Sequence, residues 1–293
     1  MCGIIGYVGH REAVPILLNG LMRLEYRGYD SAGIAVLHNG SAQITKVKGK
    51  VVNLIDRLNN GFVSGTIGLG HTRWATHGEP SERNAHPHTD CQKRIILIHN
   101  GIIENYYTLK VMLSAKGHIF RTDTDSEVLA HLIEEFYQGN IEQAVREALQ
   151  QVKGTYGLAV LCCDEPNKIV AARMGSPLVV GLGSGEYFIA SDMAAMVEHT
   201  RDVIYLNDGE IAVVSQNGVY HTDLKAREVP KDVAHIYFDL EEIEKGGFPH
   251  FMLKEIFEQP ESLTNTIRGR LIEEEGNAKL GGLAEFEKQL REV

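Results

Sequence analysis

Hydrophobic positions in the first 225 residues follow two periods. Alternating or β-branched apolar runs bounded by glycine, asparagine or aspartate predict short strands. These runs are Ile4–Val8, Ala32–Leu37, Thr66–Gly70, Ile95–His99, Leu158–Cys162, Ile169–Ala172, Leu178–Leu182, Phe188–Ser191, Val203–Leu206 and Ile211–Ser215. Apolar positions at helical spacing predict helices at Ala13–Glu25, Val51–Asn59, Asn105–Ala115, Ser126–Tyr137 and Ile141–Gln151.

The order of these elements favours one fold class. Residues 155–219 read almost entirely as strand, while several helices precede them as a block. Elements that come in blocks are typical of an antiparallel sheet with helices layered on it, which is an α+β arrangement rather than a doubly wound one. Asp125 is expected to cap the helix that begins at Ser126, and Gly117 and Gly139 are expected to end helices.

The pattern changes after about residue 224. A charged stretch is followed by an acidic segment that ends in Gly-Gly, which indicates a linker. Phe251–Ile267 then has helical spacing, and we expect Pro260 to break it. The remaining residues are too few to build a core of their own. We interpret this part as the opening of a second domain or as a docking arm.

Composition narrows the class of protein. The chain has 43% hydrophobic residues, 29 Lys+Arg and 39 Asp+Glu, for a net charge of −10. Without a long basic run, this acidic balance argues against binding to nucleic acid or to an anionic membrane. We find neither a targeting signal nor an apolar run long enough to span a bilayer. The four cysteines include the adjacent Cys162 and Cys163 and form no disulfide framework, which favours a cytoplasmic location.

Two common kinds of site are not predicted. No P-loop or dinucleotide fingerprint occurs, and a short glycine cluster at 181–185 fits a hairpin turn better than a phosphate site. Histidines do gather in one part of the chain, with Cys91 nearby, but their spacing matches no zinc motif. These histidines are His71, His77, His86, His88 and His99. We therefore expect no metal.

The strongest chemical signal is Met1-Cys2-Gly3. Cys2 is the kind of small second residue after which the initiator methionine is normally removed, and removal would leave a thiol and a free α-amine on one residue. An N-terminal amine has a pKa of about 7.7–8.0 and can accept a proton at neutral pH. Nucleophile and base would then share Cys2, as in N-terminal nucleophile hydrolases. Alone, the motif also fits a small buried residue that opens a strand.

Four further blocks support the catalytic interpretation. They are Leu24–Gly33 (LEYRGYDSAG), His71–Gly78 (HTRWATHG), His99–Asn105 (HNGIIEN) and Thr124–Glu127 (TDSE). With Cys2, they closely resemble the class II glutamine amidotransferase half of the glutamine–fructose-6-phosphate aminotransferases. The resemblance runs to about residue 240. It resumes at His250–Pro260, which is similar to the entry to that family's sugar isomerase half.

The resemblance implies a fold and a catalytic apparatus. The fold would be a four-layer αββα sandwich of the N-terminal nucleophile hydrolase type. Cys2 would attack the side-chain amide of L-glutamine and form a glutamyl thioester. The side-chain NH₂ of Asn100 and the backbone N–H of Gly101 would form the oxyanion hole, and Asn-Gly is by itself also a hairpin signal. No cofactor is implied.

The resemblance also implies a substrate-binding set. Arg73 would grip the α-carboxylate of glutamine with the help of Thr76, and Asp125 would bind the α-ammonium. Trp74 would belong to a loop that covers glutamine and gates ammonia. For His77, loop packing and substrate contact are both open, and Arg27 either orders the surroundings of the nucleophile or forms a structural ion pair with Asp30.

The implied organisation is a glutaminase domain at residues 2–240, a linker at 241–249 and the truncated start of a sugar isomerase domain at 250–293. Fructose 6-phosphate would bind only to the missing isomerase domain, and the full-length enzyme would be a homo-oligomer. Two alternatives stay open: an amidotransferase with another acceptor or a standalone glutaminase, and a metal-binding module built on the histidines.

Overall fold

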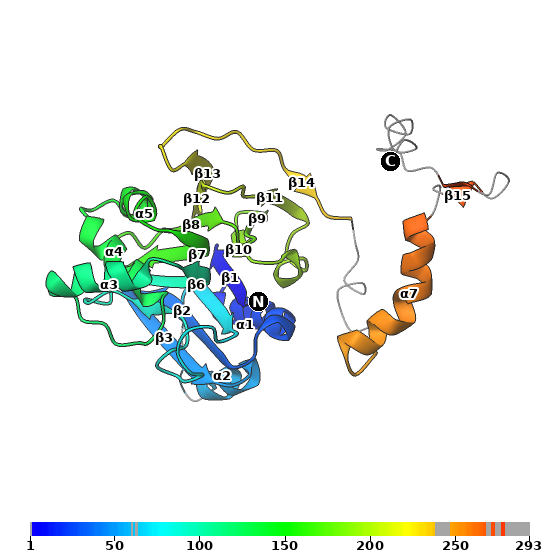
Figure 1. The fold of residues 1–293 in the computed structure, drawn as a ribbon, viewed down its shortest axis with the longest axis horizontal. Helices are drawn as coiled ribbons and strands as arrows, with labels where there is room; N and C mark the ends of the chain where they lie inside the picture. Colours follow the sequence, from blue (N-terminus) through cyan, green and yellow to red (C-terminus); the bar gives the residue numbers. More distant parts are fainter. Residues whose placement is uncertain are drawn as a thin grey trace, which may run out of the picture. The chain divides into compact units, whose positions relative to one another are not determined.

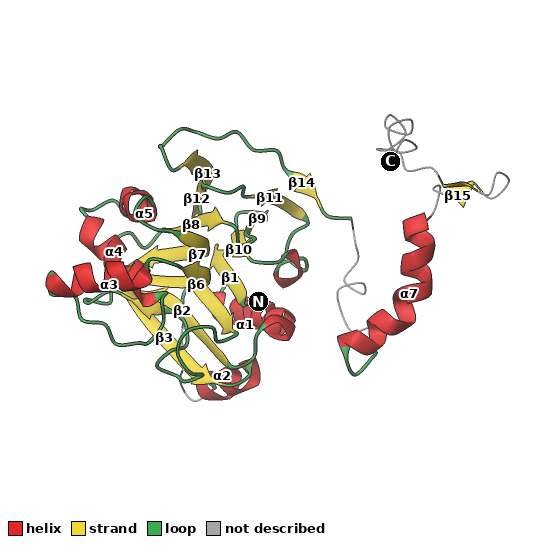
Figure 2. Cartoon of the chain, viewed as in Figure 1, coloured by secondary structure: helices red, strands yellow, loops and turns green. Residues whose placement is uncertain are grey.

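The computed structural model describes residues 2–59, 61, 64–237, 247–267, 271–272 and 277–278. The chain divides into two compact units, Met1–Phe238 and Asp239–Val293. Two antiparallel sheets form the first unit, and helices lie on both sides of them (Figures 1 and 2).

The first sheet places the strand that begins at Gly3 near its centre. Its order is β14 (Ala234–His235), β11 (Asp202–Tyr205), β9 (Val179–Leu182), β10 (Tyr187–Ala190), β1 (Gly3–Val8), β4 (Ile67–Arg73), β2 (Ser31–His38) and β3 (Ser41–Lys48). The second sheet has the order β13 (Gly218–Asp223), β12 (Glu210–Ser215), β8 (Lys168–Met174), β7 (Gly154–Cys162), β6 (Ile95–Ile103) and β5 (His88–Thr89).

Three apolar clusters define the layers. The side chains of Ile4 and Leu69 from the first sheet pack against Ile96 and Ile98 from the second. A second cluster joins the outer face of the first sheet to helices α1 (Ala13–Leu24) and α2 (Val51–Leu58). A third joins the outer face of the second sheet to α3 (Tyr106–Ala115), α4 (Glu127–Phe136) and α5 (Ile141–Leu149). The expected four-layer αββα sandwich is therefore confirmed.

Each predicted strand and helix of this unit is present, with ends shifted by a few residues. The prediction missed β3, whose side chains are mostly exposed or half-buried, because an edge strand needs little apolar alternation. It also missed β5, β13 and β14. Short 3₁₀ turns at Glu25–Arg27 and Met193–Ala195 complete the unit.

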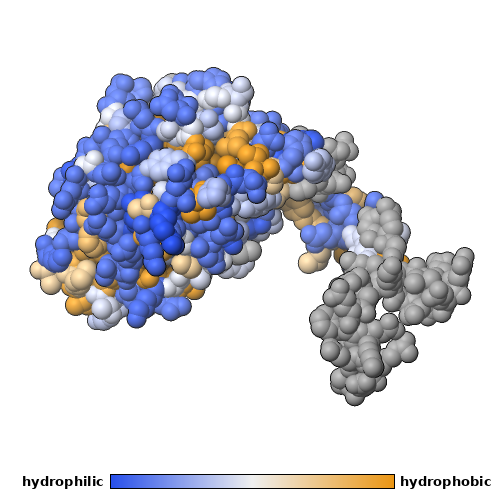
Figure 3. Space-filling model, turned by 90° about the horizontal axis from the view of Figure 1, so that it is seen from above, coloured by the Kyte–Doolittle hydropathy of each residue, from blue (hydrophilic) through white to orange (hydrophobic). Residues whose placement is uncertain are grey.

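The second unit contains helix α7 (Phe251–Ile267) and the short strands β15 (Leu271–Ile272) and β16 (Asn277–Ala278), which pair antiparallel. The predicted break at Pro260 is wrong, because Pro260 lies inside this 17-residue helix. Most of the predicted linker lies outside the described residues. None of the described helices is long and apolar enough to cross a membrane. The face of the first unit that is seen in Figure 3 is mostly hydrophilic, with a patch of hydrophobic side chains.

Candidate active site

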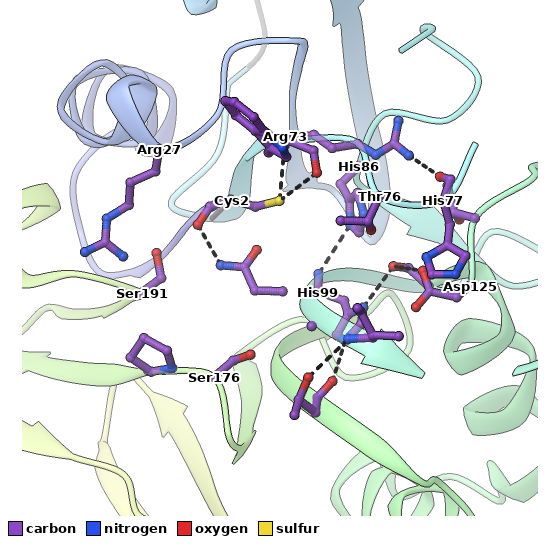
Figure 4. Close-up of a pocket in the computed structure, with 18 residues that line it drawn as sticks. Cys2, Arg27, Arg73, Thr76, His77, His86, His99, Asp125, Ser176 and Ser191 are labelled. Carbon is purple, nitrogen blue, oxygen red and sulfur yellow. Dashed lines mark hydrogen bonds between the residues drawn. The ribbon is translucent and has the colours of Figure 1, made fainter. Parts of the chain in front are cut away.

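A cavity of about 310 Å³ lies in the first unit and contains every residue predicted for catalysis or substrate binding. These residues are Cys2, Arg27, Arg73, Trp74, Thr76, His77, Asn100, Gly101 and Asp125. Figure 4 shows Arg27 and Ser191 on one side of Cys2, and Thr76, His77 and Asp125 on the other. The cavity is thus assembled from both sheets and from the segment before α4.

Cys2 is placed by its neighbours in the first sheet. It directly precedes β1, where Gly3 pairs with Thr72 of β4 and the Gly3 N–H donates to Thr72 Oγ1 over 3.2 Å. The half-buried Cys2 thiol accepts a hydrogen bond from the Trp74 N–H at 3.1 Å. Burial raises the pKa of the Cys2 thiol, and the Trp74 N–H opposes that rise. The thiol therefore needs a nearby base to become a thiolate.

Asn100 lies in the second sheet and faces Cys2. Its Nδ2 donates to the carbonyl oxygen of Cys2 at 2.8 Å, and its Oδ1 lies 2.9 Å from His71 Nε2. Burial lowers the pKa of His71 to about 3, so the ring is neutral near pH 7. Because Oδ1 only accepts, His71 Nε2 carries the proton and donates. His71 thereby fixes the amide with its NH₂ toward Cys2.

Gly101 follows Asn100 within β6, where the two residues pair with Tyr156 and Gly157 of β7. The hairpin alternative for Asn-Gly is wrong, because the strand continues to Ile103. Gly101 has φ +139°, and a Cβ there would lie 2.0 Å from the carbonyl oxygen of Thr155. Only glycine fits this backbone.

Arg73 ends β4 and is held by the loop that follows it. Its guanidinium donates to the carbonyl oxygens of His77 and Gly78, the latter at 3.0 Å. Burial lowers the pKa of Arg73, while the charges of Asp30 and Asp125 oppose this. An arginine stays protonated at any such shift. Arg73 therefore supplies a fixed positive charge to the cavity.

Asp125 supplies the opposite charge and is only 3% exposed. Its Oδ2 accepts the Ile103 N–H at 2.8 Å, and its side chain makes no helix-capping bond. The prediction that Asp125 caps α4 is wrong: the residue at the N-cap position is Ser126. The Asp125 carboxylate instead accepts the Ile103 N–H at the end of β6, and this hydrogen bond holds the carboxylate at the cavity wall.

The remaining predicted residues contact different partners. Arg27 forms an ion pair with Asp192. Trp74 is 50% exposed, and its ring meets Tyr29 edge to face with centroids 5.7 Å apart. The His77 ring packs on Tyr106 at 5.5 Å, so loop packing is observed for a side chain that also lines the cavity.

Half of the lining was not predicted from sequence. The additional residues are His86, His99, Ile102, Thr124, Ser126, Thr155, Ser176, Pro177 and Ser191. Ser191 follows β10, and its Oγ accepts the Ile4 N–H at 2.9 Å, which fixes the start of β1. His99 and Ile102 stand in the HNGIIEN block and Thr124 and Ser126 in the TDSE block, so a sequence signal for these four exists. The other five residues belong to none of the four blocks, and only the fold brings them to the cavity.

Three buried histidines pack together, and one of them, His86, also lines the cavity. The rings of His71 and His86 stack with centroids 4.0 Å apart, and His86 and His88 meet at 4.3 Å. Burial lowers the pKa of His86 and of His88 well below the usual value, as it does for His71. All three rings are therefore neutral in the folded protein at neutral pH.

This cluster predicts acid lability. Near pH 7.5 the three histidines are largely neutral in both states, because the unfolded pKa is about 6.5. As the pH falls from there toward the folded pKa values, only the unfolded chain takes up the protons, so stability is lost. Each histidine should remove about 1.4 kcal/mol from the free energy of unfolding between pH 7.5 and 5.5. Urea unfolding at the two pH values measures the loss. It should shrink in His88→Gln and persist in His10→Gln, since His10 is exposed; equal losses in both variants would contradict the assignment.

Sequence comparison places the chain among amidotransferases. A family model for the glutamine amidotransferase domain matches residues 56–237. The glutamine–fructose-6-phosphate aminotransferase of Chlorobaculum tepidum is 56% identical over 300 aligned positions, which cover 100% of this chain and 49% of the relative. The same enzyme of Thermus thermophilus is 54% identical over 281 positions, covering 96% and 46%. The chain spans about half the length of these curated relatives.

Solved structures agree on the fold. The glutamine phosphoribosylpyrophosphate amidotransferase of B. subtilis superposes with a TM-score of 0.67 at 28% identity, covering 78% of this chain and 50% of that one. The chain thus has the fold of the class II amidotransferases, and the expected N-terminal nucleophile hydrolase type is confirmed.

Proposed function

We infer the function of this chain from its family, because it belongs to the glutamine amidotransferase domain family. We propose that its cavity hydrolyses L-glutamine to glutamate and ammonia. One observation carries the proposal: Cys2, Asn100 and Gly101 share a single cavity with the opposite charges of Arg73 and Asp125. A reactive thiol, an oxyanion site and two ends for an amino acid are what this reaction requires.

The substrate's orientation follows from the charges. The Arg73 guanidinium binds the α-carboxylate, with Thr76 as a hydroxyl donor, and the Asp125 carboxylate binds the α-ammonium. The side-chain amide then extends toward Cys2. Trp74 and His77 lie in the segment after β4 and would cover the substrate, while Arg27 orders the wall near Asp192.

The chemistry begins after removal of Met1. The α-amine of Cys2, directly or through a water, takes the thiol proton, and the sulfur attacks the amide carbon. The Asn100 NH₂ and the Gly101 N–H bind the oxyanion as it forms. The C–N bond breaks, and the α-ammonium of Cys2 returns its proton to the nitrogen, which leaves as ammonia. Water then cleaves the glutamyl thioester, which releases glutamate and restores the thiol.

The whole protein's activity extends this proposal. We propose that residues 2–240 are the glutaminase domain, 241–249 a linker and 250–293 the start of a sugar isomerase domain. With that domain present, ammonia would pass to fructose 6-phosphate and form glucosamine 6-phosphate. We also propose a cytoplasmic enzyme, on the basis of its free cysteines, and a homo-oligomer when full length.

A direct assay tests the function. The purified chain should convert glutamine to equal amounts of glutamate and ammonia, and fructose 6-phosphate should yield no amino sugar with this chain. No glutamate release from a folded, Met1-processed chain would refute the proposal. Amino sugar formation by this chain would refute the division of labour. Ammonia delivery to a different acceptor in the full-length protein would favour the alternative amidotransferase.

Asp125→Asn tests the proposed substrate orientation. The amide oxygen can still accept the Ile103 N–H, but the charge that meets the α-ammonium is gone. Losing a charged hydrogen bond of roughly 1.5–3 kcal/mol should raise KM for glutamine about 10- to 100-fold. The deamino analogue of glutamine should show no such difference between wild type and variant. Asp164→Asn, at a surface ion pair, is the matched control; an equal KM rise for the analogue would contradict the role.

A further inference from the structure

A second cluster of reactive side chains lies away from the cavity. Cys91 lies in the connection between β5 and β6, and His118 lies just after α3. His131 and Glu134 follow one turn apart on α4, which lies beside α3 (Figure 1). One ligand atom from each of the four side chains lies within 4.8 Å of the others. Three separate segments therefore converge on one point.

The distances between these atoms match a metal-binding tetrahedron. Cys91 Sγ lies 3.7 Å from His118 Nδ1 and 3.4 Å from His131 Nδ1, and the two nitrogens are 3.3 Å apart. Glu134 Oε2 lies 3.1 Å from His118 Nδ1 and 3.5 Å from His131 Nδ1. Zinc bonds of about 2.3 Å to sulfur and about 2.0–2.2 Å to nitrogen and oxygen place tetrahedral ligand atoms roughly 3.3–3.7 Å apart. Four of the five distances fall in this range, and the distance from Glu134 Oε2 to His118 Nδ1 is shorter.

Hydrogen bonds alone account poorly for this convergence. His118 Nδ1 faces three polar atoms, from Cys91, His131 and Glu134. An imidazole nitrogen carries at most one proton and makes one hydrogen bond as donor or as acceptor. A divalent cation at the centre would accept a lone pair from all four ligand atoms at once.

The surroundings of both histidines fit metal ligands. If each ring binds through Nδ1, its Nε2 faces a carboxylate: Glu135 Oε2 is 3.2 Å from that of His118, and Glu127 Oε1 is 3.7 Å from that of His131. Carboxylates in this position orient a metal-bound imidazole and raise its basicity. Glu127 is itself held by the Thr122 N–H at 2.7 Å.

We propose that Cys91, His118, His131 and Glu134 bind one Zn²⁺ ion. Because the protein supplies four ligands, the site is structural rather than catalytic. It would tie the β5–β6 connection and the end of α3 to α4, whose first turn follows Asp125 and Ser126 at the cavity. The ion would thereby stiffen the support of the substrate-binding carboxylate. The proposal does not depend on which reaction the cavity performs.

Cobalt titration tests the site directly. The chelator-stripped, reduced chain should bind about one Co²⁺ per chain and show tetrahedral d–d bands with a thiolate-to-cobalt charge-transfer band, and Zn²⁺ should displace the cobalt. Cys91→Ser should lose the charge-transfer band, and His131→Ala should lose tetrahedral binding. Cys163→Ser is the matched cysteine control, since Cys163 lies outside the cluster. A folded wild-type chain that binds no cobalt, or a spectrum unchanged in Cys91→Ser, would overturn the proposal.

A measurement on the wild-type chain covers the case in which the variants fail to fold. Zn²⁺ should slow alkylation of Cys91 by a maleimide, mapped by mass spectrometry, and should leave alkylation of Cys163 unchanged. Thermal unfolding should shift upward on Zn²⁺ addition and return with a chelator. Equal alkylation of Cys91 with and without Zn²⁺ would refute the site, and the cluster would then be a hydrogen-bonded one only.

Discussion

Cys2→Ala is expected to lower kcat for glutamine hydrolysis by at least about a thousandfold. Removing a nucleophile leaves only the rate enhancement that comes from binding and from the oxyanion site. Alanine keeps a small second residue, so removal of Met1 and the position of the α-amine should be preserved. The change removes the thiol that accepts the Trp74 N–H, and it leaves the buried residues of β1 that follow unchanged. Glutamine affinity and thermal stability should therefore stay close to wild type.

The control for Cys2→Ala is Cys163→Ser, which should retain full activity. An alkylating glutamine analogue should label the Met-less wild-type chain at Cys2, detected by mass spectrometry of the N-terminal peptide, and should label Cys163→Ser equally. More than about one percent residual activity in Cys2→Ala would show that another group attacks the amide. Labelling at another cysteine would lead to the same conclusion.

Much of the fold follows from the order of apolar positions. Runs such as Ile95–His99 and Leu158–Cys162 are buried on both faces, and their apolar residues alone predict β6 and β7. The ends are harder to predict, because a strand can continue through polar residues when its neighbour supplies hydrogen bonds. Asn100 and Gly101 extend β6 for this reason, by pairing with β7. The hairpin signal in Asn-Gly is overridden by tertiary pairing.

The candidate site could be predicted where a residue belongs to a motif. Cys2, Arg73 and Asp125 stand in blocks that resemble a known family, and the structure brings them to one cavity. His71 belongs to the same block, but its role depends on the contact with Asn100 across the two sheets. No local pattern encodes that contact. The sequence motifs therefore predict residues that line the cavity, but they do not predict the contact by which His71 orients the Asn100 amide.

The proposed zinc site shows the same limit more strongly. Cys91 and His118 lie on separate connections, and only His131 and Glu134 share a helix face. Zinc motifs in sequence depend on short spacings, because neighbouring ligands then come from one turn or one hairpin. Here the packing of α3 and α4 on the second sheet supplies the proximity. The sequence places Cys91 near several histidines, but its spacing does not predict which side chains would bind a metal together with it.

Asn100→Ala is expected to lower kcat about 100- to 1,000-fold while KM changes little, since loss of one oxyanion donor costs roughly 2.7–4 kcal/mol in the transition state. Asn100→Asp should lose more, because a carboxylate would repel the developing oxyanion. Steady-state kinetics with glutamine measure both. Asn217→Ala, in the β12–β13 turn, is the matched control and should keep wild-type kcat.

His71→Phe tests how the Asn100 amide is aimed. Phenylalanine can keep the stack on His86 but cannot donate to Asn100 Oδ1, so the amide loses the contact that fixes its orientation. One such hydrogen bond contributes about 1 kcal/mol, which corresponds to a loss of several-fold to about tenfold in kcat. The double variant with Asn100→Ala should lose no more than Asn100→Ala alone, because His71 acts only through that amide. Additive losses in the double variant would mean that His71 acts on the reaction by another route. If His71 acts only through the Asn100 amide, His71→Gln should recover part of the rate, because the glutamine side chain restores an N–H donor.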